Sequence, residues 1–265
     1  MKRPIIFLGM IWILVFCFSI SAGGADIDFG TYQVKIEKWG CKVLLPDGRV
    51  LINRFFPQIH LPKGVKGHTY HNFKFKKPVV EKEDNRRILI GSGIFKKTVS
   101  EAGININANI EMTYKIIFSP EGKISLHYEF FNNGDEVFLE PYVNADVNYD
   151  LCKGETWEVK KVQGQTQKGK WPEKIIHGIK SVDWSRGKPV ELQIISATLN
   201  TKLGKPIIYN LSSQTHLRVV GGGRITLYNF KHFAGVYTNY NWKPFQKKEK
   251  FSIDAEIILP VGSAN

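Results

Sequence analysis

Alternating apolar and polar residues dominate this chain. From residue 104 onward every second position is apolar, and the positions between are polar: Ile104, Ile106, Ala108, Ile110, Met112, Tyr114 and Ile116 form the apolar set. Because successive side chains of a β-strand point to opposite faces, this pattern predicts one long strand with a core face and a solvent face. After a turn at 119–122 the alternation resumes over 124–130. We expect these two strands to form an antiparallel pair.

The same pattern predicts most of the other strands. It recurs at 32–36, 43–45, 50–52, 190–195, 207–211, 217–220, 225–230 and 251–258. The Asn-Gly pair within Asn132-Asn133-Gly134-Asp135 is a strong hairpin signal. No segment of ten residues has a convincing period of 3.6, so the sequence predicts an all-β protein. About a dozen strands require two packed sheets or a barrel, and we favour a large antiparallel two-sheet sandwich.

We expect residues 25–265 to form a single domain. No Pro/Ser-rich linker divides them, and no repeat of 20 to 50 residues is visible. Between residues 154 and 186 the alternation fades, while three tryptophans and six lysines gather there. This segment predicts a loop-rich excursion, made of loops or of a short hairpin.

The first 24 residues have the order of a secretory signal peptide. Lys2 and Arg3 precede an apolar run from residue 5 to 18, and small residues follow. An uncleaved N-terminal anchor is the alternative, since the apolar run is long and contains Trp12. Both readings predict export, to the periplasm or outside the cell. No later run reaches the roughly 20 apolar residues that span a bilayer, so we expect no transmembrane span after cleavage.

Export leaves Cys41 and Cys152 in a compartment where disulfides persist. A bridge between them would close a long loop, but the spacing does not say whether their Cα atoms come within bridging distance. Two separately buried thiols are the alternative.

The charge is the unusual part of an otherwise ordinary globular composition. There are 37 Lys+Arg against 24 Asp+Glu, a net charge of +13, whereas 43% hydrophobic and 23% charged residues exclude a disordered or collagenous protein. A basic surface favours anionic partners. Nucleic acid is one such partner, but an exported protein seldom meets it, so we do not expect nucleic-acid binding in function.

Several phrases resemble the galactose mutarotase-like β-supersandwich of aldose 1-epimerases. They are an opening phrase at 32–40 with a hairpin ending at 48–52, a central phrase at 122–135 followed by Glu140-Pro141-Tyr142-Val143-Asn144, and a closing phrase at 258–263. Together they cover roughly half of residues 25–265. The resemblance implies a mutarotase-like fold and the handling of sugars.

Two departures from that family concern the catalytic residues. Where family epimerases carry a histidine on the strand after the central turn, this chain has Glu140. Their late catalytic glutamate also has no counterpart, because residues 235–245 contain no acid. The resemblance therefore implies a divergent member without the usual catalytic His and Glu, and it argues against mutarotation.

The candidate catalytic residues depend on the protein being an enzyme. Glu140 is a candidate general base, with His127 or His232 as its partner, and a carboxylate paired with a lysine is the alternative. His60, His68 and His71 could suggest a metal site, but lysines surround them and carboxylates are scarce, so we expect no metal and no other cofactor.

The aromatic residues favour a carbohydrate-binding role. Aromatic rings can stack on pyranose rings while Asn hydrogen-bonds the hydroxyls, and the candidates are Tyr237, Asn239, Tyr240, Trp242, Trp157, Trp171 and Trp184. Interleaved lysines would suit an acidic glycan. We therefore predict an exported protein that binds carbohydrate without turnover, with an anionic polysaccharide as a candidate ligand. The alternatives are a sugar epimerase or polysaccharide-degrading enzyme of the same fold, and a basic envelope-associated structural protein.

Overall fold

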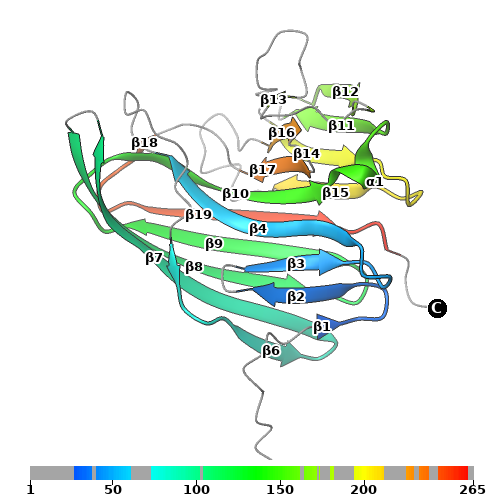
Figure 1. The fold of residues 1–265 in the computed structure, drawn as a ribbon, viewed down its shortest axis with the longest axis horizontal. Helices are drawn as coiled ribbons and strands as arrows, with labels where there is room; N and C mark the ends of the chain where they lie inside the picture. The colour runs from blue at the N-terminus through cyan, green and yellow to red at the C-terminus, as the bar shows by residue number, and fades with distance from the viewer. Residues whose placement is uncertain are drawn as a thin grey trace, which may run out of the picture.

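The computed structural model of this chain consists of two antiparallel β-sheets packed face to face (Figure 1). It describes residues 27–37, 40–60, 73–101, 104–161, 164–171, 173, 180–181, 194–211, 225–229, 233–238 and 244–261. The signal peptide predicted for residues 1–24 lies outside the described residues. Among the described residues no helix is long and apolar enough to cross a membrane. The predicted all-β sandwich is confirmed.

One sheet has nine strands. Its order is β1-β2-β3-β4-β10-β17-β16-β13, and β18 pairs with β10. The bounds are β1 Ile27–Asp28, β2 Gln33–Glu37, β3 Gly40–Leu44, β4 Val50–His60, β10 Phe138–Asn148, β13 Lys180–Ser181, β16 Ile225–Asn229, β17 Phe233–Thr238 and β18 Pro244–Phe245. A single helical turn, α1 Tyr149–Cys152, follows β10.

The other sheet has ten strands. Its order is β12-β11-β14-β15-β19-β9-β8-β7-β5, and β6 pairs with β7. The bounds are β5 Lys74–Phe75, β6 Val79–Glu83, β7 Arg86–Glu101, β8 Ile104–Phe118, β9 Lys123–Asn132, β11 Thr156–Lys161, β12 Thr166–Lys170, β14 Ile194–Leu199, β15 Ile207–Leu211 and β19 Lys250–Ile258.

The alternation in the sequence sorts residues between the core and the outside as expected. In β9 the even-numbered residues from Ile124 to Phe130 are buried, and their neighbours are more exposed. Tyr114 of β8 lies opposite Tyr128 of β9, and the two rings stack at a centroid distance of 5.5 Å. The predicted antiparallel pair of 104–116 and 124–130 is therefore confirmed as β8 and β9.

The Asn-Gly turn does not make the hairpin that the sequence predicts. It joins β9 of the ten-stranded sheet to β10 of the nine-stranded sheet, so the chain changes layers at residues 133–137. A type I′ hairpin needs positive φ at both central residues, but neither Asn133 nor Gly134 is among the residues with positive φ. Instead Asn132 is fully buried, and its Oδ1 accepts a hydrogen bond from the Gly134 backbone N–H at 3.2 Å.

The described part of the tryptophan-rich segment contributes strands to both sheets. Over residues 154–171 the described chain forms the β11–β12 hairpin, and β11 also pairs with β14. Trp157 lies opposite Gly169, where an added Cβ would come within 2.1 Å of the Trp157 ring. The glycine thus leaves room for the ring. Of the two alternatives for this segment, a short hairpin is present.

Candidate functional site

A face of the nine-stranded sheet carries a group of buried polar side chains. Val143, Ala145 and Val147 of β10 belong to the hydrophobic core. Because side chains alternate along a strand, Tyr142, Asn144 and Asp146 lie on the opposite face, turned away from that core. They are nevertheless buried, with exposed fractions of 2%, 0% and 1%.

The neighbouring strand β4 supplies the partners. Its core residues include Phe55 and Ile59, so Arg54, Phe56 and Gln58 alternate onto the outer face. Gln58 lies directly opposite Tyr142, and Phe56 lies opposite Asn144. Pro57 has no backbone N–H to donate. The strand tolerates it because, among the described residues, β3 pairs with β4 only near Val50 and Ile52, so position 57 does not need to donate a hydrogen bond to β3.

These side chains form one continuous series of hydrogen bonds, which we call the polar network. The Tyr142 hydroxyl donates to Gln58 Oε1, and Gln58 Nε2 donates to Asn144 Oδ1 at 2.9 Å. Asn144 Nδ2 donates to Asp146 Oδ1 at 2.9 Å. Arg54 Nε donates to Asp146 Oδ2 at 2.8 Å. The network therefore orients each planar side chain through its neighbour.

The network contains a buried carboxyl group, Asp146, and ends at a partly exposed cation, Arg54. Burial raises the pKa of Asp146 above its ordinary value, although the Arg54 guanidinium and the Asn144 amide favour the charged form. The Arg54 side chain is 36% exposed, and its guanidinium carbon lies 5.0 Å from the centre of the Phe56 ring. Arg54 thus presents a fixed cation and an aromatic neighbour at the end of a buried network.

This arrangement is suited to binding polar ligands. A guanidinium held by a carboxylate keeps a fixed orientation, so it can pair with a carboxylate or with hydroxyl groups of a ligand at low entropic cost. Asp146 is the network's only carboxyl group. Among the described residues no group of three or more His, Cys, Asp and Glu side chains could hold a metal ion.

Two of the candidate residues lie in strands of this sheet. Glu140 falls in β10 at an irregularity, where the pairing with β4 shifts between Leu139 and Tyr142. Tyr237 falls in β17 directly opposite Asn144. The side chains of Glu140 and Tyr237 are outside the described part of the structure, so their roles stay predictions. His232, Asn239, Tyr240, Trp242 and Trp184 lie outside the described residues, as do His68 and His71.

His127 belongs to the other sheet. Its neighbours Leu126 and Tyr128 are core residues, so the His127 side chain lies on the outer face of the ten-stranded sheet. There its Nδ1 is 2.6 Å from Asp254 Oδ1. The strand that carries Glu140 is in the opposite layer, and the structure therefore does not bring His127 together with Glu140 as a catalytic pair.

Two of the tryptophans predicted to bind a ligand, Trp157 and Trp171, are buried. Trp157 and Trp171 are only 4% and 1% exposed, and both belong to the hydrophobic core. Trp171 packs edge-on against Tyr149 at a centroid distance of 6.3 Å. The prediction that these two rings stack on a ligand is wrong, because the pairing of β11 with β14 and the packing around α1 bury their faces.

Of the two alternatives that the sequence left open for Cys41 and Cys152, the structure has no bridge. Both residues are buried free thiols, as in the alternative reading. Cys41 lies in β3 of the nine-stranded sheet, and Cys152 ends α1, which follows the more central strand β10. Burial raises the pKa of both thiols, so both are held in the neutral form.

Sequence reasoning missed Arg54, Gln58, Asn144 and Asp146. The alternation Tyr142-Val143-Asn144-Ala145-Asp146-Val147 was a usable signal for a strand with a polar face. Nothing in that pattern indicates that the polar face is buried or that it bonds to residues about 90 positions earlier.

The likeness of this chain to known proteins lies in its fold. No protein-family model and no curated protein matches this chain. A solved structure assigned as an aldose 1-epimerase, from Klebsiella pneumoniae, is similar over 88% of this chain and 80% of its own, with a TM-score of 0.50 and 10% identity. A galactose mutarotase related enzyme from Lactobacillus acidophilus is similar over 89% of this chain and 96% of its own, with a TM-score of 0.47 and 11% identity. The chain thus has the galactose mutarotase-like fold, as the resemblance in its sequence predicted.

Proposed function

We propose that this protein is exported and binds carbohydrate on the outer face of the nine-stranded sheet, with acidic glycans as its preferred ligands and without turnover. The observation that carries the proposal is the polar network, which ends on the half-exposed Arg54. The Arg54 guanidinium, oriented by Asp146 and by the buried amides behind it, matches the carboxylate and hydroxyl groups of an acidic sugar. The net charge of +13 supports attraction to a polyanion.

The absence of turnover is proposed from the chemistry of the same residues. Epimerisation needs a separate acid and base positioned on the two sides of the reacting bond. The polar network supplies one carboxyl group, and Arg54 and Asn144 already bind both of its oxygens. His127 is on the other sheet.

A glycan-array screen of the purified protein tests the binding proposal. It is run at about 0.15 M and at about 0.5 M salt, because added salt weakens attraction between exposed charges much more than it weakens contacts in a formed site. Binding to one family of uronic-acid glycans at both salt concentrations supports the proposal. Binding to every polyanion, lost at the higher salt, would support the basic envelope-associated protein instead.

An enzyme of the same fold is the second candidate, and the raised pKa of Asp146 favours it, because a general base near neutral pH requires such a shift. Polarimetry of freshly dissolved aldoses with and without the protein separates the two candidates. We expect the rate of anomer interconversion to equal the uncatalysed rate. An acceleration that Asp146→Asn or Glu140→Gln abolishes would establish the enzyme.

A further inference from the structure

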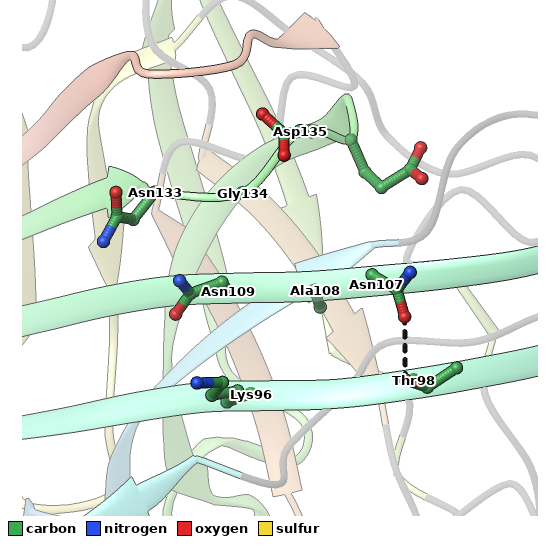
Figure 2. Close-up of a pocket in the computed structure, with 9 residues that line it drawn as sticks. Lys96, Thr98, Asn107, Ala108, Asn109, Asn133, Gly134 and Asp135 are labelled. Carbon is green, nitrogen blue, oxygen red and sulfur yellow. Dashed lines mark hydrogen bonds between the residues drawn. The ribbon is translucent and has the colours of Figure 1, made fainter.

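A polar cavity that shares no residue with the polar network lies near the end of the β7–β8 hairpin (Figure 2). Its volume is about 530 Å³, within the range of small-molecule sites. β7 provides Lys96 and Thr98, and β8 provides Asn107 and Asn109 as their direct cross-strand partners. Directly opposed residues share a face, so these four side chains line one wall. The turn between β9 and β10 forms the other wall.

The turn is held firmly in place over β8. Asn132 Nδ2 donates to the backbone oxygens of Glu136 at 2.7 Å and Gln246 at 3.0 Å. Lys248 Nζ donates to the Asn133 backbone oxygen at 2.8 Å. A Cβ added to Gly134 would lie 3.3 Å from the Asn109 backbone nitrogen, so the turn backbone approaches β8 closely. The cavity is therefore formed before any ligand binds.

Its amide groups offer both donors and acceptors. The Thr98 hydroxyl donates to Asn107 Oδ1 at 2.7 Å, which fixes the Asn107 side chain with its amide nitrogen available to donate (Figure 2). Asn109 Oδ1 is a buried acceptor with no hydrogen-bond partner among the described residues. A buried acceptor without a partner is costly, so a rotation of the Asn109 side chain that turns this oxygen toward a ligand donor would be favourable.

The charges of this cavity differ from those of the whole protein. Lys96 contributes one positive charge, and Asp135 and Glu136 contribute two negative charges. In the part of the chain that the structure describes, none of these three side chains forms an ion pair. The lining is thus net negative in a protein with a net charge of +13. Lys248, whose Nζ lies 2.8 Å from the Asn133 backbone oxygen, adds a positive charge beside the lining, so the preference for a cationic group rests on the adjacent carboxylates of Asp135 and Glu136.

We propose that this cavity is a separate binding site for a saccharide that is uncharged or carries an amino group. Each sugar hydroxyl both donates and accepts, which matches amides that present Nδ2 of Asn107 and Oδ1 of Asn109. The carboxylate of Asp135 then favours an ammonium group on the sugar. The site goes beyond the proposed function, because the polar network favours acidic ligands and shares no residue with this cavity.

The test compares three hexoses of one configuration: glucose, glucosamine and glucuronate. Each is titrated into the ¹⁵N-labelled full chain, and the side-chain NH₂ signals of Asn107 and Asn109 are followed by NMR. We expect glucosamine to bind about two- to fivefold more tightly than glucose, since an exposed charge pair contributes modestly, and glucuronate to bind most weakly. Asp135→Asn should remove the preference for glucosamine.

Matched variants separate this site from general charge effects and from the polar network. Glu81→Gln removes one exposed carboxylate on β6, opposite Ile88 of β7, and should retain the preference. Arg54→Met should leave these titrations unchanged even if it abolishes binding of acidic glycans. Asp135 is exposed, so its variant is expected to fold, and retained backbone signals verify this. Signals of Asn107 and Asn109 that respond to no hexose, or that respond most to glucuronate, would overturn the proposal.

Discussion

Replacing Arg54 by methionine would leave Asp146 buried without its cationic partner. Methionine keeps most of the aliphatic length of arginine but cannot donate to Asp146 Oδ2, which Arg54 Nε contacts at 2.8 Å. Removing one partner of a fully buried ion pair costs about 3 to 5 kcal/mol. Because the Arg54 side chain is 36% exposed, solvent screens part of the interaction, and we expect a loss of about 2 to 3 kcal/mol at pH 7.5.

The loss should depend on pH in a defined direction. Burial raises the pKa of folded Asp146 above its unfolded value. A group of this kind favours the folded state most below its unfolded pKa, and the contribution is lost as the pH rises through the folded pKa. Without Arg54 the folded pKa rises further. The variant's deficit should therefore be smaller at pH 5 than at pH 7.5, with a slope of at most about 1.4 kcal/mol per pH unit.

Urea unfolding followed by tryptophan fluorescence measures both effects. Trp157 and Trp171 are buried and report on the folded core. The control is a double-mutant cycle with Asp146→Asn, in which Arg54→Met should cost much less and should show no added pH dependence. A cost below about 0.5 kcal/mol at both pH values, or an equal cost in the Asp146→Asn background, would refute the assigned pairing.

Three further predictions concern the core and the network. Tyr142→Phe should lower the free energy of unfolding by about 1 to 2 kcal/mol in the same urea assay, because Gln58 Oε1 loses its hydroxyl donor; an unchanged value would contradict that hydrogen bond. Gly91→Ala should lower the free energy of unfolding by about 1 to 3 kcal/mol, since a Cβ there would lie 2.2 Å from the Tyr114 ring. Gly48 has open space around it but a positive φ, so Gly48→Ala should lower the free energy of unfolding by less. Thermal unfolding of the two variants compares these losses. Cys41 and Cys152 should react with a thiol reagent only after denaturation, because both are buried and their raised pKa values disfavour the thiolate; rapid reaction of the native protein would contradict this.

Local patterning predicted the strands better than it predicted the site. The alternation over 104–116 identifies β8 because each polar position faces away from the core. It underestimates β4, which extends to His60, because Arg54 and Gln58 combine with Pro57 to obscure the period. Strand length in this part of the sheet is determined by pairing with β10, which is distant in sequence.

The polar network required information that no local pattern contains. Gln58 and Asn144 are 86 positions apart, and Arg54 and Asp146 are 92 apart. Only the register of β4 against β10 brings these residues together. For the tryptophans, the sequence predicted a site that the structure does not have. Their aromatic rings suggested exposed residues that stack on a ligand, whereas cross-strand pairing placed Trp157 over Gly169 and inside the core.

The binding of an acidic oligosaccharide by three forms of the protein tests the central claim most directly. Titration calorimetry at about 0.15 M and about 0.5 M salt would compare the wild type, Arg54→Met and Arg49→Met, using the uronic-acid glycan bound best on the array. Arg49 pairs with Asp47 on the surface, so its replacement removes the same charge outside the polar network. We predict that Arg54→Met weakens binding at least tenfold at both salt concentrations, about 1.4 kcal/mol, whereas Arg49→Met has little effect. Equal weakening by both variants, vanishing at the higher salt, would contradict a binding site at the polar network.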